Sequence, residues 1–279
     1  MKVRKRVLPP GWYPGTAREC EREIKNMIVG FSPPPGRWTA GVAPHAGWFF
    51  SGRPAAKAVS GLAASNPSAQ AVVVFGGHLP EGERPIVYGE DAWETPFGNL
   101  DMDADLALDL TGKADAVRAP ASFADNTVEI QLPLVKWFFP KAVLIAAHTP
   151  ASLEAQTFAS ALWDLLQERG RSAVFLGSAD LTHYGPDYGF APKGTGSDAV
   201  KWVKEVNDKS LVDKVLSMDA AEVLEDARIR HNTCSAGPIV SAMTCAARGG
   251  VQRGVLLEYA TSHDIRPASS FVGYAAILF

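Results

Sequence analysis

Short apolar segments alternate with helical patterns along the chain, and this alternation limits the possible folds more than any other feature of the sequence. The apolar segments are Trp38–Ala43, Ala71–Phe75, Ala142–Ala147, Ala173–Gly177, Val255–Ala260 and Phe271–Leu278. Runs such as AVVVF lack polar residues, which is typical of strands buried on both faces. Helical patterns cover residues 17–30, 53–65, 103–111, 128–139, 151–169, 197–217 and 233–248. We therefore predict one domain over residues 1–279, a three-layer α/β/α fold with a largely parallel central sheet.

Composition argues against several classes of protein. The 279 residues carry 27 Lys and Arg against 30 Asp and Glu, a net charge of −3, whereas nucleic-acid binding normally needs a basic surface. No apolar run reaches the roughly 18 residues that a membrane span requires. The basic start, Met1–Arg6, is followed by turn-forming residues instead of an apolar signal-peptide core. Three cysteines form no disulfide framework, so we expect a cytoplasmic protein without nucleic-acid or membrane partners.

Four of the six histidines lie just past the carboxyl end of a predicted strand: His45, His78, His148 and His183. Asp180 lies in the same turn as His183. A single histidine at such a position is usually a capping or packing residue, but the recurrence at strand ends shifts the balance toward a functional site. Because open α/β sheets build their sites at the carboxyl ends of parallel strands, we expect these side chains to gather at one edge of the sheet.

Cys234 stands at the start of the predicted helix 233–248. A helix N-terminus lowers the pKa of a thiol and favours the thiolate, which binds metals or attacks substrates. A small buried residue at a helix start is an equally good interpretation. Cys20 and Cys245 lie within predicted helices and are interpreted as small core residues. Imidazoles together with a thiolate suit Zn, Cu or Fe, and two imidazoles with one anionic ligand match the general pattern of a non-heme Fe(II) centre.

Motifs along almost the whole chain resemble the Memo family, whose prokaryotic members are called AmmeMemoRadiSam system protein B. The matching stretches are Gly11-Trp12-Tyr13-Pro14, Ala43-Pro44-His45-Ala46-Gly47, Gly76-Gly77-His78, Val128-Glu129-Ile130-Gln131-Leu132-Pro133, Ser178–Gly185, Cys234 with Pro238-Ile239, and Val272–Ala276. The family is similar in fold to the class III (LigB-type) extradiol dioxygenases, which bind non-heme Fe(II). Iron and copper have both been associated with the family.

The sequence departs from the family pattern in three places. Asn126 replaces a pocket histidine, Ser235 replaces a glycine, and a His-His pair is reduced to His78-Leu79. An amide does not titrate, so Asn126 cannot transfer protons as the family histidine would. His148 is a residue that the resemblance does not lead us to expect, and it is our candidate for a substitute imidazole.

The resemblance implies a non-heme metal-dependent, dioxygenase-like oxidoreductase acting on a small substrate, for which an aromatic compound is one candidate. His45, His78 and Cys234 would hold Fe(II), with Cu or Zn as alternatives, and O₂ would bind beside the substrate. His183 would act as the acid/base, oriented by Asp180. The residues expected to line the substrate pocket are Trp12, Tyr13, Trp48, Asn126, Glu129, Tyr184 and His148.

Two other functions fit the same residues. One is a metal-binding and protein-interaction module without turnover. The other is a hydrolase that uses Cys234 as a nucleophile, activated by His183 and Asp180, or that uses a Zn-activated water.

Overall fold

The computed structural model describes residues 1–120 and 123–279. Within these residues, nine strands form a central sheet with the order β10-β12-β2-β9-β3-β8-β4-β7, and β11 pairs with β12. Its strands are β2 (Ala40–Ala43), β3 (Ala71–Gly76), β4 (Ile86–Val87), β7 (Val117–Arg118), β8 (Val143–His148), β9 (Ala173–Ser178), β10 (His183–Tyr184), β11 (Val255–Thr261) and β12 (Phe271–Leu278). A small second sheet holds β1 (Val3–Arg4), β5 (Ala92–Thr95) and β6 (Gly98–Asp101).

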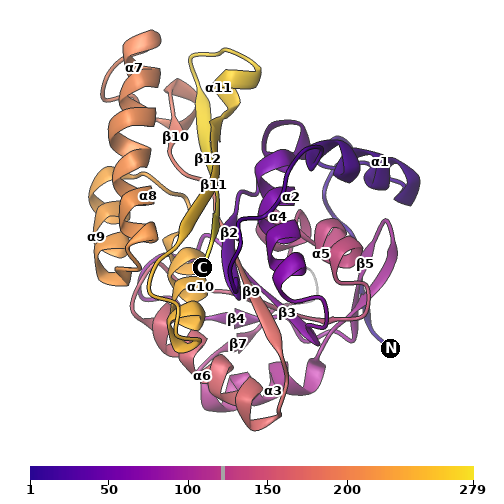
Figure 1. Ribbon diagram of the computed structural model, residues 1–279. Coiled ribbons are helices and arrows are strands. Elements are labelled where there is room, and N and C mark those ends of the chain that lie inside the picture. The colour runs from indigo at the N-terminus through magenta and orange to yellow at the C-terminus, as the bar shows by residue number, and fades with distance from the viewer. Residues whose placement is uncertain (121–122) are drawn as a thin grey trace.

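Helices cover both faces of the central sheet (Figure 1). They are α1 (Ala17–Met27), α2 (Trp48–Ser65), α3 (Ala104–Lys113), α4 (Asn126–Glu129), α5 (Leu132–Phe138), α6 (Glu154–Glu168), α7 (Ser197–Trp202), α8 (Asp208–Leu216), α9 (Ala220–Arg230), α10 (Ala236–Arg248) and α11 (Ser262–Ile265). None of the helices in the described part of the chain is both long and apolar enough to cross a bilayer.

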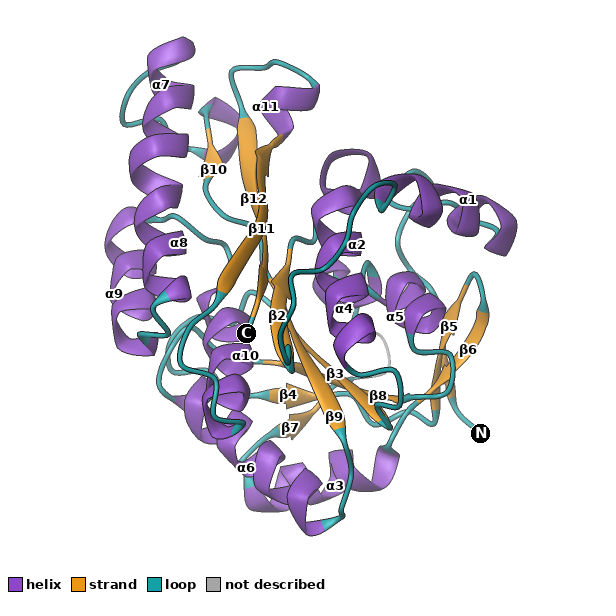
Figure 2. Cartoon of the chain, in the orientation of Figure 1, coloured by secondary structure: helices purple, strands orange, loops and turns teal. Residues whose placement is uncertain are grey.

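The strands in the middle of the sheet are parallel, as predicted: β2, β9, β3 and β8 share one direction. At the edges of the sheet, β12 is antiparallel to β2 and β4 is antiparallel to β8, so the sheet is largely but not wholly parallel. β11 and β12 are joined through the short helix α11, and their antiparallel ribbon extends beyond the parallel strands (Figure 2). A parallel pair would need a crossover connection longer than this link.

Two separate apolar cores lie on the two faces of the sheet, which confirms the three-layer α/β/α arrangement. Successive residues of β3 alternate between them: Val73 and Phe75 face the core under α3, α6, α8, α9 and α10, whereas Val72 and Val74 face the core under α1, α2, α4 and α5. This alternation follows from the two-residue repeat of a strand. It explains why the runs in the centre of the sheet are continuously apolar.

Four parts of the chain differ from the predicted elements. The helix expected over residues 128–139 is two helices, α4 and α5, and Pro133 lies in the first turn of α5, where its missing N–H costs nothing. The helix expected over residues 197–217 is interrupted by a π-helical turn at Val203–Asn207, which is followed by the fully buried Asp208. Helix α9 and the β5–β6 hairpin were not predicted.

Candidate metal centre

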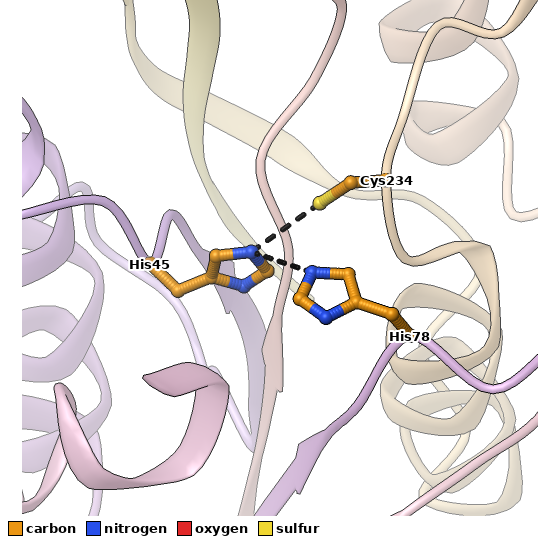
Figure 3. A group of neighbouring side chains, drawn as sticks. All are labelled: His45, His78 and Cys234. Atoms are coloured by element: carbon orange, nitrogen blue, oxygen red, sulfur yellow. Dashed lines mark hydrogen bonds between the residues drawn. The ribbon is translucent and has the colours of Figure 1, made fainter. Parts of the chain in front are cut away.

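Three potential metal ligands converge at the carboxyl edge of the sheet (Figure 3). His45 follows β2, His78 follows β3, and Cys234 precedes α10. The Nε2 atom of His45 lies 3.3 Å from Nε2 of His78 and 3.3 Å from Sγ of Cys234, and all three donor atoms lie within 4.8 Å of one another. His45 is buried, Cys234 is half-buried and His78 is exposed. Side chains from distant parts of the sequence therefore meet in one cluster that is accessible from one side.

The spacing of the donors fits a shared metal ion. Two ligands bound at about 2.1 Å with a tetrahedral angle between them lie roughly 3.4 Å apart. Both measured separations from His45 Nε2 are 3.3 Å, close to this value. Neutral imidazole and thiolate are ligands for Zn, Cu and Fe, so the donor chemistry agrees with the geometry.

Hydrogen bonds fix the backbone that carries His45. Its N–H donates to Oδ1 of Asp180 at 2.7 Å, and its carbonyl oxygen accepts from Nδ2 of Asn126 at 3.2 Å. Gln131 donates from Nε2 to the carbonyl of Pro44 at 2.8 Å. The side-chain amide of Asn126 thus holds in place the loop that carries His45, and this hydrogen bond does not require a change of protonation state.

Asp180 joins the two sides of the site. Its Oδ2 lies 3.8 Å from Nε2 of His45 and 3.7 Å from Nε2 of His183. Its backbone carbonyl accepts hydrogen bonds from the hydroxyl of Thr233 at 2.6 Å and from the N–H of Cys234 at 3.3 Å. One residue therefore positions the turn with His183, the loop with His45 and the loop with Cys234.

A cavity of about 400 Å³ opens beside the cluster. Its wall includes His45, His78, Asp180 and His183, together with Tyr188, whose ring packs edge-on against that of His183 at 4.9 Å between centroids. A second cavity, of about 420 Å³, shares His183 and Tyr188 with the first and also reaches Cys234. The donors consequently border on open space large enough for a small molecule.

The charges within the site favour a thiolate between protonated imidazoles. Burial lowers the pKa of His45, but the negative charges of Asp180 and Cys234 outweigh burial and raise it to about 9. Burial likewise opposes charge on His183, whose pKa rises to about 10 because Asp180 and Cys234 lie close. Burial alone would raise the pKa of Cys234, yet the facing imidazoles bring it well below its usual value. Since a ligating cysteine must be deprotonated, the site is prepared to exchange protons for a cation.

Two of the residues expected in the pocket, Trp12 and Asn126, line the cavity of about 400 Å³. Glu129 does not line it: this buried carboxylate accepts hydrogen bonds from the N–H groups of Val7 and Leu8 at 2.8 and 3.0 Å and from the hydroxyl of Tyr13 at 2.9 Å. Glu129 and Tyr13 therefore fasten the N-terminal segment that carries Trp12.

The other expected pocket residues are buried away from this cavity. Trp48 donates from its indole N–H to the carbonyl of Ile130 at 3.3 Å. Tyr184 is fully buried and stacks on Phe271, with ring centroids 5.2 Å apart. His148 is 1% exposed and lies behind the site at the end of β8. A ring-bearing side chain that lies close to a motif in the sequence is thus not necessarily part of the cavity wall in three dimensions.

Several residues of the site were missed at the sequence level. They are Asp125, Gln131, Tyr188, Thr233 and Arg266, which line the cavity or hold its loops. Gln131 lies in a stretch that matches the family, and Asp125 directly precedes Asn126, where the sequence departs from the family pattern, so both polar side chains could have been identified from the sequence. Arg266 lies in the loop after α11, and no motif marks it.

Comparison with known proteins agrees with the motifs. The family model described as Memo-like protein matches residues 4–278. A MEMO1 family protein of Methanosarcina mazei is 28% identical over 283 residues, covering 100% of this chain and 99% of that protein. A MEMO1 family protein of Thermococcus onnurineus is 29% identical over 252 residues, covering 86% of each chain.

Among solved structures, an uncharacterised protein of Escherichia coli K12, JW3007, aligns over 79% of this chain and 91% of its own, with a TM-score of 0.49 and 9% identity. A similarity this low says nothing about function. The family model, in contrast, spans nearly every residue, including the three converging donors. The chain belongs to the Memo family.

Proposed function

We propose that His45, His78 and Cys234 bind one Fe(II) ion and that the protein is a dioxygenase-like oxidoreductase acting on a small substrate. The observation that carries this proposal is the convergence of the three donors within 4.8 Å beside a cavity of about 400 Å³. Two imidazoles and one anionic ligand leave coordination positions free, which is the general pattern of non-heme iron sites that use O₂. The bound iron would supply electrons and an attachment point for O₂.

The protein's own groups perform the remaining tasks. Trp12 and Tyr188 line the cavity and supply aromatic surface for a small, apolar or aromatic substrate. His183 holds a proton beside the cavity, oriented by Asp180, and serves as the acid/base. Part of the increase in the pKa of His183 comes from the negative charge of Cys234, so a cation bound to this thiolate would lower the pKa of His183 toward the range where an imidazole exchanges protons.

The first experiment measures metal stoichiometry. Protein purified without oxygen is loaded with Fe(II) and analysed by elemental analysis, together with the variants His45→Ala and Cys234→Ala. Both substitutions should abolish stoichiometric iron. Cys245→Ala is the matched control, because this cysteine is fully buried in α10 and belongs to no donor cluster among the described residues. Equal iron in Cys234→Ala and in the control would refute the proposed ligand set.

The second experiment measures turnover. The iron-loaded protein is mixed with a panel of catechol-like compounds while O₂ uptake is recorded. We expect uptake with at least one compound, lost in His45→Ala and strongly lowered in His183→Gln, which should keep its iron. Full iron occupancy without O₂ uptake for any compound would reject the oxidoreductase and leave metal binding without turnover.

A second candidate function is a hydrolase that uses Cys234 as its nucleophile. The sequence suggests His183 and Asp180 as the activating groups, and the observation that favours this function is instead the imidazole of His45: its Nε2 lies 3.3 Å from Sγ of Cys234, a thiolate–imidazole pair of the kind that activates cysteine nucleophiles. Alkylation distinguishes the two roles. A ligand thiol reacts quickly with iodoacetamide in the metal-free protein and slowly after loading, whereas a nucleophilic thiol reacts equally fast in both.

A further inference from the structure

We propose that His148 is a positioning residue for His78: it holds Asp125 so that one carboxylate oxygen faces the imidazole of His78. This inference rests on the proposed function in one respect, namely that His78 is a metal ligand. It assigns a task to a buried cluster behind the site that none of the steps above uses.

The first observation is the orientation of the His78 ring. Its Nε2 faces the cluster, 3.3 Å from Nε2 of His45, whereas its Nδ1 faces away, 3.9 Å from Oδ2 of Asp125. A ligating histidine commonly directs its second ring nitrogen at a carboxylate, which fixes the tautomer and the ring orientation. Since the side chain of His78 is 41% exposed, its neighbours on the cavity side constrain it little, and its second nitrogen faces the carboxylate of Asp125 at a distance longer than a direct hydrogen bond.

The second observation is that Asp125 is held at its other oxygen. Oδ1 accepts hydrogen bonds from the N–H of Thr127 at 2.7 Å and from the hydroxyl of Thr127. The same oxygen lies 3.4 Å from Nε2 of His148. With Oδ1 held in this way, Oδ2 is left to face His78.

The third observation is that His148 is itself rigidly placed. It is 1% exposed, and its Nε2 lies 2.9 Å from the hydroxyl of Tyr88. The rings of Tyr88 and Phe123 pack against it, with centroids 5.3 and 5.2 Å away. The position of the imidazole is therefore determined by packing on two sides and by one hydrogen bond.

The fourth observation connects His148 with the backbone next to His78. Gly77 has a φ of +91°, and a Cβ at this position would lie 2.5 Å from Cγ of His148. The N–H of Gly77 donates to the hydroxyl of Thr127 at 2.7 Å. His148 thus packs against the residue before the ligand, while Asp125 contacts the ring of the ligand itself. Both contacts restrict where Nε2 of His78 can lie.

The test measures binding of Co(II) alone to the whole chain, from the absorption of the thiolate-bound ion. His148→Phe fills the space but removes the polar contact, so we expect the Kd for Co(II) to rise by about 10- to 100-fold and the absorption bands to shift. His148→Gln, whose amide N–H can still reach Asp125, should bind close to the wild-type protein. Asp125→Asn should weaken binding as His148→Phe does, and the double variant should be no weaker than Asp125→Asn, because both changes act through the same contact.

Phe158→Leu is the matched control. It disturbs a fully buried side chain in the opposite core, so it lowers stability but should leave Co(II) binding unchanged. Wild-type affinity in His148→Phe, or an additive loss in the double variant, would overturn the proposal. If the wild-type protein binds no Co(II), the proposed function fails, and long-range ¹H–¹⁵N NMR of the metal-free chain still decides the positioning. His78 should then be the Nδ1–H tautomer in the wild-type protein and a mixture of tautomers in His148→Phe.

Discussion

Asp208 is a buried carboxyl group whose ionisation should weaken the fold as the pH rises. Its Oδ1 accepts hydrogen bonds from the N–H of Thr182 at 3.0 Å and from the hydroxyl of Thr182, and its Oδ2 accepts from the hydroxyl of Tyr259 at 2.7 Å. Burial outweighs these bonds and the nearby His183, and it raises the pKa of Asp208 from 3.8 to about 6. The native state consequently binds this proton more tightly than the unfolded chain.

The sign and the size of the effect follow from this difference. Stabilisation by the proton is complete below the unfolded pKa of 3.8 and is lost as the pH rises through about 6. Each unit of difference between the native and unfolded pKa corresponds to roughly 1.4 kcal/mol, so the free energy of unfolding should fall by about 3 kcal/mol over this pH range. Asp208→Asn carries no charge, and its amide can accept from Thr182 and donate to Tyr259. Between pH 4 and pH 7, the free energy of unfolding of the variant should therefore rise by about 3 kcal/mol relative to that of the wild-type protein.

Urea unfolding of both proteins at several pH values measures this difference. The exposed Asp198→Asn serves as the control, since it removes a carboxylate without a buried environment. Parallel stability profiles for the wild-type protein and Asp208→Asn would refute the reasoning, because they would mean that ionisation of Asp208 costs no more in the folded chain than in the unfolded one.

Other buried contacts give further predictions. Glu129→Ala leaves two backbone N–H groups without their acceptor, so it should cost about 2 to 4 kcal/mol in urea unfolding and speed hydrogen exchange at those two amides. Arg4→Met leaves the carboxylate of Glu90 unpaired and should cost about 3 kcal/mol in the same assay; full stability would contradict the role of this ion pair. Gly177→Ala places a Cβ 2.5 Å from the carbonyl oxygen of Pro238. It should lower the midpoint of thermal unfolding, whereas Gly112→Ala, which meets nothing within 4 Å inside α3, should raise it.

The centre of the fold could be predicted because its strands are buried on both faces. A short, continuously apolar run such as Ala71–Phe75 is compatible with few structures other than a central strand whose two faces are both covered by helices. The edges could not be predicted in the same way. Strands β4 and β7 have two residues each, too few to show a two-residue repeat. β4 forms because it pairs with β8, and β7 forms because it pairs with β4. The β5–β6 hairpin likewise pairs with β1, far away in sequence.

The candidate site was predictable to the extent that strand order brings carboxyl ends together. His45 follows β2 and His78 follows β3, two parallel strands on either side of β9, so their carboxyl ends meet at the same edge of the sheet. The direction of a side chain does not follow from topology. His148 lies at the same edge, but the two-residue repeat of β8 and the close approach of Gly77 place its ring behind the cluster instead of in the cavity. The orientation of the His148 ring depends on contacts with residues distant in sequence, which the pattern of apolar and polar residues does not indicate.

The π-helical turn at Val203–Asn207 gives this chain a place where its length can change. A π-helical turn holds about one residue more than an α-helical turn, so deleting one residue from it would leave a regular α-helix that turns through nearly the same angle. Asp208 would then keep its contacts with Thr182 and Tyr259, and the apolar face of α8 would stay in the core. A deletion within α8 itself would instead rotate the residues that follow it by about 100°. Single-residue deletions in homologous chains should consequently fall in the π-helical turn and not in α8.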